Sequence, residues 1–146
     1  VNIINALYYL NERDVTYKVE KKAKADGYTN YLEVELINDN EHVTLGASTI
    51  PGYGERLVKI NEYPIDFKPE ENILIIEHTD RPGIIGELGA LLGEDEVNIA
   101  SMQLARLSKE GDAMVLFTLD NQVNEETYAK IKDVLNIHKV HTIKLG

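Results

Sequence analysis

The chain has 146 residues, which is enough for one ordinary domain or two small ones. Its 25 acidic and 15 basic residues give a net charge of −10, which argues against nucleic acid or an anionic membrane surface as a partner. Cysteine is absent, which excludes disulfides and thiolate metal sites, and no apolar run reaches the ~18 residues of a membrane span. We therefore expect a cytoplasmic protein.

The first half of the chain predicts one helix followed by an antiparallel sheet. Apolar residues recur at helical spacing between Asn2 and Arg13, and a stripe of this kind normally packs on a sheet. Because the chain starts with Val1 in a helical pattern, we expect it to be part of a longer polypeptide. The pairs Asp39-Asn40 and Asn61-Glu62 predict turns. Partial alternation predicts strands over residues 16–20, 31–37, 42–49, 56–60 and 63–67.

A polar stretch with a proline, residues 68–72, separates this half from the next. We place a domain boundary there, which gives a first domain over residues 1–70 and a second over residues 71–146. The second half reads strand, helix, strand, strand, helix, strand, which is the ferredoxin-like βαββαβ order. Right-handed crossovers predict the spatial strand order 4-1-3-2. The predicted class is therefore α+β, with two small domains.

The apolar content of the predicted strands agrees with this order. The first strand, Ile73–Ile76, and the third, Ala113–Leu119, are almost wholly apolar and are central in it. The second strand, opening with Asn98, becomes an edge that a second copy could cover. In the last helix we expect Asn124 as the N-cap. The buried stripe predicted for that helix consists of Tyr128, Ile131, Val134 and Leu135.

The stretch from His78 to Gly83 joins the first of these strands to a helix. Asp80 is a suitable N-cap, and Pro82 suits a first turn. Glycines 83, 86, 89 and 93 share one helix face, which predicts that a sheet, a partner or a ligand approaches it closely. Free N–H groups at the helix start favour a carboxylate, and His78 and Asp80 could hold an ammonium or hydroxyl group. The same residues also fit a capped helix with a surface histidine and no ligand.

We find no catalytic, cofactor-binding or metal-binding pattern. No serine has a nucleophile-elbow context, and the glycine spacing is not G-x-G-x-x-G. His138 and His141 should point to opposite faces of a strand, which argues against a shared metal ion. We therefore do not expect this chain to be the catalyst.

The run H-T-D-R-P-G-I-I-G, followed by G-E-D-E-V-N-I-A-S-M-Q, resembles an ACT domain, an amino-acid-sensing regulatory module. It is most similar to the ACT domain that ends the D-3-phosphoglycerate dehydrogenases, in the Asp-Arg-Pro-Gly turn and in Asn98 following His78. The opening V-N-I-I-N-A and the stretch Arg56–Phe67 resemble the domain that precedes ACT in the long form of these enzymes. The resemblance covers nearly the whole chain.

This resemblance implies feedback regulation of serine biosynthesis. L-Serine would bind between the ACT domains of a homo-oligomer, held by His78, Asp80 and Asn98, with Asn98 coming from the other chain. Other members have asparagine in place of Asp80. The parent would be an NAD-dependent oxidoreductase whose catalytic and NAD-binding parts lie upstream, so this part would need no cofactor.

The resemblance also implies a second effector site, for the phosphorylated substrate, at Arg56 and Lys68. If the hairpin closes at Asn61-Glu62, Arg56 opposes Phe67 and Lys68 points to the other face. Only a bulge or an odd-length turn would align the two cations. Isolated surface cations are the simpler interpretation.

Two alternatives to the dehydrogenase remain open. One is the regulatory segment of an iron–sulfur L-serine dehydratase, and the other is an ACT dimerisation module without a ligand. The Asp-Arg-Pro-Gly turn and the stretch 56–67 favour the dehydrogenase over the dehydratase.

Overall fold

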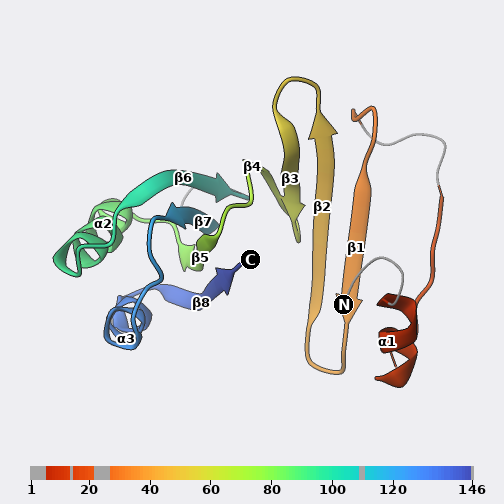
Figure 1. Cartoon of the computed structure of the whole chain (residues 1–146). Helices are drawn as coiled ribbons and strands as arrows, with labels where there is room; N and C mark the ends of the chain where they lie inside the picture. The colour runs from red at the N-terminus through yellow and green to blue at the C-terminus, as the bar shows by residue number, and fades with distance from the viewer. Residues whose placement is uncertain (1–5, 14, 22–26, 109–110, 146) are drawn as a thin grey trace.

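A computed structural model describes residues 6–13, 15–21, 27–108 and 111–145. The described strands form two four-stranded antiparallel sheets, in the orders β1-β2-β3-β4 and β6-β7-β5-β8 (Figure 1). The predicted α+β class is confirmed. The elements are α1 Ala6–Glu12, β1 Leu32–Ile37, β2 His42–Ile50, β3 Gly54–Ile60, β4 Tyr63–Phe67, β5 Asn72–Thr79, α2 Ile84–Glu94, β6 Ile99–Arg106, β7 Asp112–Leu119, α3 Glu125–Asp133 and β8 Ile137–Lys144.

The second sheet has the predicted ferredoxin-like topology. Its order β6-β7-β5-β8 is the predicted order 4-1-3-2 written from the other edge. The two apolar strands, β5 and β7, lie in the centre, as predicted. Among the described residues β6 pairs with β7 alone, so it forms one edge of the sheet. Since β5 and β6 are both antiparallel to β7, they run in the same direction.

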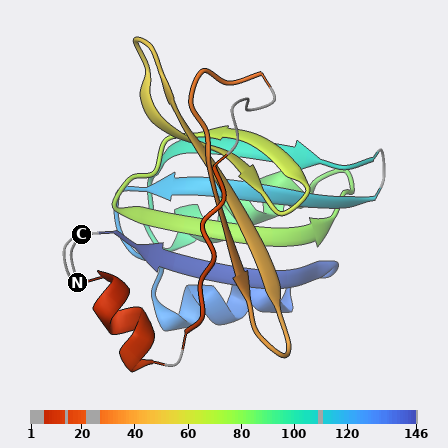
Figure 2. The ribbon, with the colours of Figure 1, turned by 90° about the vertical axis from the view of Figure 1, so that its right-hand side faces the viewer.

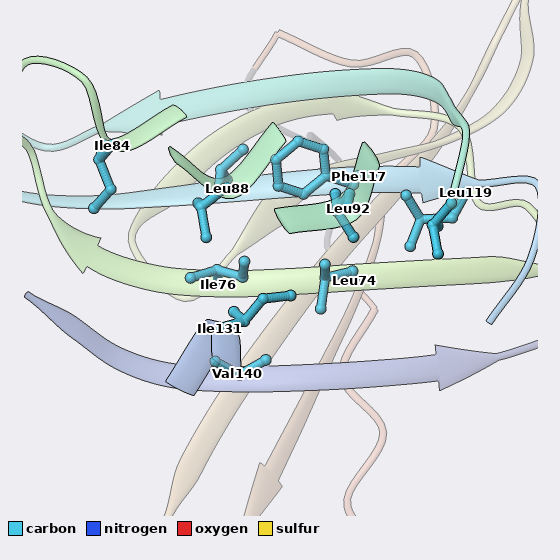
Figure 3. Packing of buried hydrophobic residues seen from close by; sticks show 11 residues of the cluster. Leu74, Ile76, Ile84, Leu88, Leu92, Phe117, Leu119, Ile131 and Val140 are labelled. Carbon is cyan, nitrogen blue, oxygen red and sulfur yellow. The ribbon is translucent and has the colours of Figure 1, made fainter. Parts of the chain in front are cut away.

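Helices α2 and α3 cover one face of this sheet (Figures 1 and 3). Leu74 and Ile76 of β5 and Phe117 of β7 are completely buried there, under Leu88 of α2 and Ile131 of α3. Full burial of a side chain of this size contributes about 1.5–3 kcal/mol to folding. Because side chains alternate between the two faces along a strand, His78 points to the same side as Leu74 and Ile76, toward the helices.

The opposite face of the second sheet packs against the β3–β4 hairpin, so the two sheets share a core. Figure 2 shows the first sheet crossing in front of the second. The contact also includes a hydrogen bond of 3.0 Å from the backbone N–H of Asp66 to Oε1 of Gln103. The domain boundary between residues 70 and 71 stays a prediction. The shared core consists of Ile60, Tyr63, Ile65, Phe67, Ile73, Ala105, Met114 and Leu116.

A β-bulge changes the pairing predicted for the β3–β4 hairpin. Leu57 opposes Phe67, so the expectation that Arg56 opposes it is wrong. The register shifts between Leu57 and Lys59, where two steps along β3 face three steps along β4, and Leu57 and Ile60 both contact the shared core. The bulge also brings Arg56 level with Lys68 across the hairpin.

Three local predictions are wrong or incomplete. Residues 16–20 form no strand, because no neighbouring strand pairs with them, and their side chains are exposed. Leu135 is 74% exposed, since the backbone is already extended at Val134. In α1, Tyr8 and Tyr9 are exposed rather than packed on a sheet, and residues 2–5 of the predicted helix lie outside the described residues.

Candidate functional site

The loop from β5 to α2 is anchored on both sides by backbone hydrogen bonds. The N–H of Thr79 donates to the carbonyl of Asn136, in the connection between α3 and β8, at 2.9 Å. The N–H of Asp80 donates to the carbonyl of Gly111, next to β7, at 2.8 Å. The loop therefore holds its side chains at a defined position above the end of the second sheet.

The prediction that Asp80 is the N-cap of α2 is wrong. The N-cap is Gly83, in the left-handed conformation with φ 89°, and in the described part of the chain no side chain makes a capping hydrogen bond to this helix. A glycine adopts this backbone conformation without strain, which explains the residue type at this position. The first N–H groups of α2 lack a side-chain acceptor, and they carry the positive end of the helix dipole.

His78 is completely buried at the end of β5. Its Nδ1 lies 3.1 Å from the carbonyl oxygen of Thr79, and since a carbonyl only accepts, Nδ1 carries the proton. In the neutral ring Nε2 is then an acceptor. It is one of four buried side-chain N or O atoms in the described part of the chain that have no hydrogen-bond partner. A buried acceptor without a partner is unfavourable, so a hydrogen-bond donor placed at Nε2 would be stabilising.

One row of the second sheet links His78 to a residue that the sequence did not single out. Ala113 of β7 is opposite His78 on one side and opposite Arg106 of β6 on the other. Directly opposite residues share a face, so all three lie on the helix side of the sheet. Nη1 of Arg106 lies 3.0 Å from Oδ2 of Asp80, whose side chain is 16% exposed. No sequence pattern indicated this pair, because only the sheet register brings β6 beside the loop.

Arg81, the next loop residue, has a positioning role that the sequence also did not indicate. Its Nη2 donates to Oε2 of Glu87 at 2.6 Å and to the carbonyl of Leu135 at 3.4 Å. These bonds tie the loop to the first turn of α2 and to the end of α3. The Asp-Arg-Pro-Gly turn is therefore held by its arginine as well as by its backbone.

Asn98 lies at the opposite end of the second sheet from His78 and Asp80. Its Nδ2 donates to Oδ2 of Asp120 at 2.7 Å, and its carbonyl accepts from the N–H of Asp120 at 3.1 Å. Since β5 and β6 run in the same direction, the length of β6, about 25 Å, separates Asn98 from the end of β5 that carries His78. One chain therefore joins His78 with Asp80 but leaves Asn98 apart from them.

The face of α2 that carries Gly86, Gly89 and Gly93 is open. A Cβ placed at any of these positions would meet no heavy atom within 4 Å among the described residues. The expected close approach is therefore absent among the described residues.

The two cations predicted to hold a phosphate are each paired with a carboxylate. Nε of Arg56 lies 2.7 Å from Oδ1 of Asp66, and Nη2 donates to the carbonyl of Asp66 at 2.9 Å. Nζ of Lys68 lies 3.0 Å from Oε1 of Glu70. The bulge aligns the two backbones, but the two side chains have separate partners.

In the same described ranges no group of three or more His, Asp or Glu side chains could hold a metal ion. None of the helices there is both long enough and apolar enough to span a bilayer.

Comparison with known proteins extends over the whole chain. Residues 72–136 match the family model described as ACT domain. The chain is 33% identical over 145 residues to the D-3-phosphoglycerate dehydrogenase of Bacillus subtilis (strain 168), covering 99% of this chain and 27% of that protein. The enzyme of Synechocystis sp. is 35% identical over 147 residues, covering 99% and 26%. That of Methanocaldococcus jannaschii is 32% identical over 145 residues, covering 99% and 27%.

The chain thus spans about a quarter of the length of these relatives, each of which is named D-3-phosphoglycerate dehydrogenase. The matched residues coincide with the elements from β5 to α3, which carry His78, Asp80 and Asn98. Residues 72–136 of this chain are an ACT domain.

Proposed function

We propose that this chain is the C-terminal regulatory region of a D-3-phosphoglycerate dehydrogenase and that its ACT domain binds L-serine. The observation that carries the proposal is the completely buried His78, whose Nε2 has no hydrogen-bond partner among the described residues, next to a helix without a side-chain cap. A serine zwitterion has three polar groups, and each of them fits one part of the site. The N–H groups of α2 bind the carboxylate, the carboxylate of Asp80 binds the ammonium group, and Nε2 of His78 accepts from the hydroxyl.

A second copy of the chain completes the site in this proposal. Strand β6 is the edge of the second sheet, and Met102 on it is 47% exposed. If two β6 strands pair antiparallel around Met102, Asn98 of the partner subunit lies opposite Arg106, because both are equally far from Met102. Since Asp120 holds the amide nitrogen of Asn98, its Oδ1 is left to accept from the ammonium group.

Regulation in the proposed parent follows from linkage. L-Serine lowers turnover at a distant active site only if it binds one arrangement of the subunits more tightly than another. The NAD-dependent oxidation of 3-phosphoglycerate takes place in parts of the enzyme outside this chain, and the chain acts in the cytoplasm. The names of the three relatives favour the dehydrogenase over an L-serine dehydratase. Arg56 and Lys68 support no second proposal, because each has a carboxylate partner.

Calorimetric titration of the chain with L-serine tests this proposal, with D-serine and glycine as competing ligands. We expect stereoselective binding that is weakened roughly ten- to hundredfold in Asn98→Ala, the loss expected for a hydrogen bond to a charged group. The matched control is Asn40→Ala, an exposed amide in the β1–β2 turn, which should bind like the unchanged chain. Sedimentation of the same samples gives the oligomeric state. A dimer that binds no amino acid would refute the proposal and leave an ACT dimerisation module.

A further inference from the structure

The carboxylate of Asp80 already has a cationic partner within the chain. Nη1 of Arg106 lies 3.0 Å from its Oδ2. The carboxylate is mostly shielded from solvent at 16% exposed, whereas the arginine side chain is 51% exposed. One partner is therefore held in place by the anchored loop, and the other extends from the last residue of the edge strand β6.

The small side chain of Ala113 allows Arg106 to reach Asp80. Strand β7 lies between β6 and β5, and Ala113 is the residue of β7 opposite both Arg106 and His78. Any longer side chain at position 113 would occupy the helix side of the sheet between Arg106 and the loop. The guanidinium, the carboxylate of Asp80 and the free Nε2 of His78 thus belong to one end of one sheet face.

The half-exposed guanidinium can exchange its partner for water, but the shielded carboxylate of Asp80 then needs another cation in its place. An ammonium group that reaches the same carboxylate carries the same charge in a more compact form. The two cations therefore compete for Asp80, and each lowers the affinity of the site for the other.

Building on the L-serine site proposed above, we propose that Arg106 is a specificity-determining residue that competes with the ligand's ammonium group for the carboxylate of Asp80. In the absence of ligand the guanidinium neutralises Asp80, so the site presents no net negative charge that would attract cations in general. A ligand displaces Arg106 only when it adds further contacts, which a zwitterion makes at the start of α2 and at His78. Arg106 thus lowers the affinity for the amino acid and narrows the range of ligands.

The test is calorimetric titration of the whole chain with L-serine, comparing the unchanged sequence with Arg106→Gln. Glutamine keeps most of the side-chain length but removes the charge. We expect a Kd about two- to fivefold lower in Arg106→Gln, the range that corresponds to an exposed ion pair. The matched control is Arg56→Gln, which removes the same charge from the Arg56–Asp66 pair on the first sheet and should leave Kd unchanged.

A double-mutant cycle separates competition from a structural effect. In an Asp80→Asn background there is no carboxylate to compete for, so Arg106→Gln should no longer lower Kd. Urea midpoints of all variants report stability separately. Binding of L-serine to the unchanged chain together with an equal or higher Kd in Arg106→Gln overturns this inference and leaves the serine site standing. Absence of L-serine binding in every variant overturns both.

Discussion

Tyr31 lies across Gly46 on the face of the first sheet that points away from the second sheet. Its hydroxyl donates to Oε2 of Glu33 at 2.7 Å, and Nζ of Lys59 lies 2.9 Å from the same oxygen. A Cβ at position 46 would overlap the Tyr31 hydroxyl and press on Cβ of Lys59, so only glycine leaves room for this contact. Burial, followed by the hydrogen bond to Glu33, raises the pKa of Tyr31 to about 12.

This raised pKa predicts an alkaline loss of stability. The folded chain keeps the Tyr31 proton up to about pH 12, whereas the unfolded chain releases it near pH 10, so stability falls as pH rises through that window. Urea midpoints at about pH 9.5 and 11.5 should differ less in Tyr31→Phe than in the unchanged chain. The control is Tyr53→Phe, at a turn residue that is 76% exposed. It should lose as much stability between the two pH values as the unchanged chain. Equal losses in all three chains would contradict the assignment.

Single residues were predictable from sequence where their partner is close along the chain. Asn124 is the N-cap of α3 as predicted, and its Oδ1 accepts from the N–H of Thr127 at 2.8 Å. Asp80 was not predictable, because its partner Arg106 reaches it only through the register of three strands. The buried state of His78 follows from alternation along β5, but its free Nε2 depends on side chains from other elements.

At the scale of elements, α2 is a helix with glycines on an open face. Gly89 is an interior helical residue, and a Cβ there would meet nothing within 4 Å. Because alanine restricts the unfolded chain more than glycine does, Gly89→Ala should raise the free energy of unfolding by about 0.5–1 kcal/mol. Urea denaturation at low protein concentration measures this effect.

The control for this helix is Gly83→Ala, which should lower the stability because φ is 89° at that residue. A lower stability of Gly89→Ala that appears only at concentrations where the chain associates would mean that a partner contacts this face. That outcome would restore the close approach predicted from the glycine spacing.

The elements of the ACT domain were predictable because periodicity and connection rules act locally. Apolar runs identified β5 and β7, and right-handed crossovers gave the strand order. The register shift between β3 and β4 was not predictable, since the sequence of these two strands has no bulge-specific pattern. Residues 16–20 alternate like a strand but lack a neighbour, and alternation alone cannot supply one.

At the scale of the whole molecule, the two sheets are joined by a common apolar core. Phe67 of β4 is 3% exposed and belongs to the same cluster as Met114 and Leu116 of β7. The sequence indicated an apolar face on each sheet, but not that these two faces meet. The position of the first sheet on the second was therefore beyond sequence reasoning.

Phe67→Ala should lower the free energy of unfolding by about 3–5 kcal/mol, because it leaves a cavity between the sheets. Since both sheets line the cavity, we expect a single urea transition with a lower midpoint. Far-ultraviolet circular dichroism measures this transition. Tyr53→Ala, at an exposed turn residue, should change the stability by less than about 0.5 kcal/mol. Two separate transitions, with the second sheet retaining its original midpoint, would show that the sheets are energetically independent.

Strand β6 contacts its surroundings in two directions. Among the described residues no strand pairs with its outer edge, while Gln103 on the same strand holds the backbone of Asp66 in β4. Whatever joins that edge also restrains the strand from which Gln103 projects. If a second chain pairs with that edge, its binding and the order of the preceding hairpin are thermodynamically coupled, and the coupling free energy is the same in both directions.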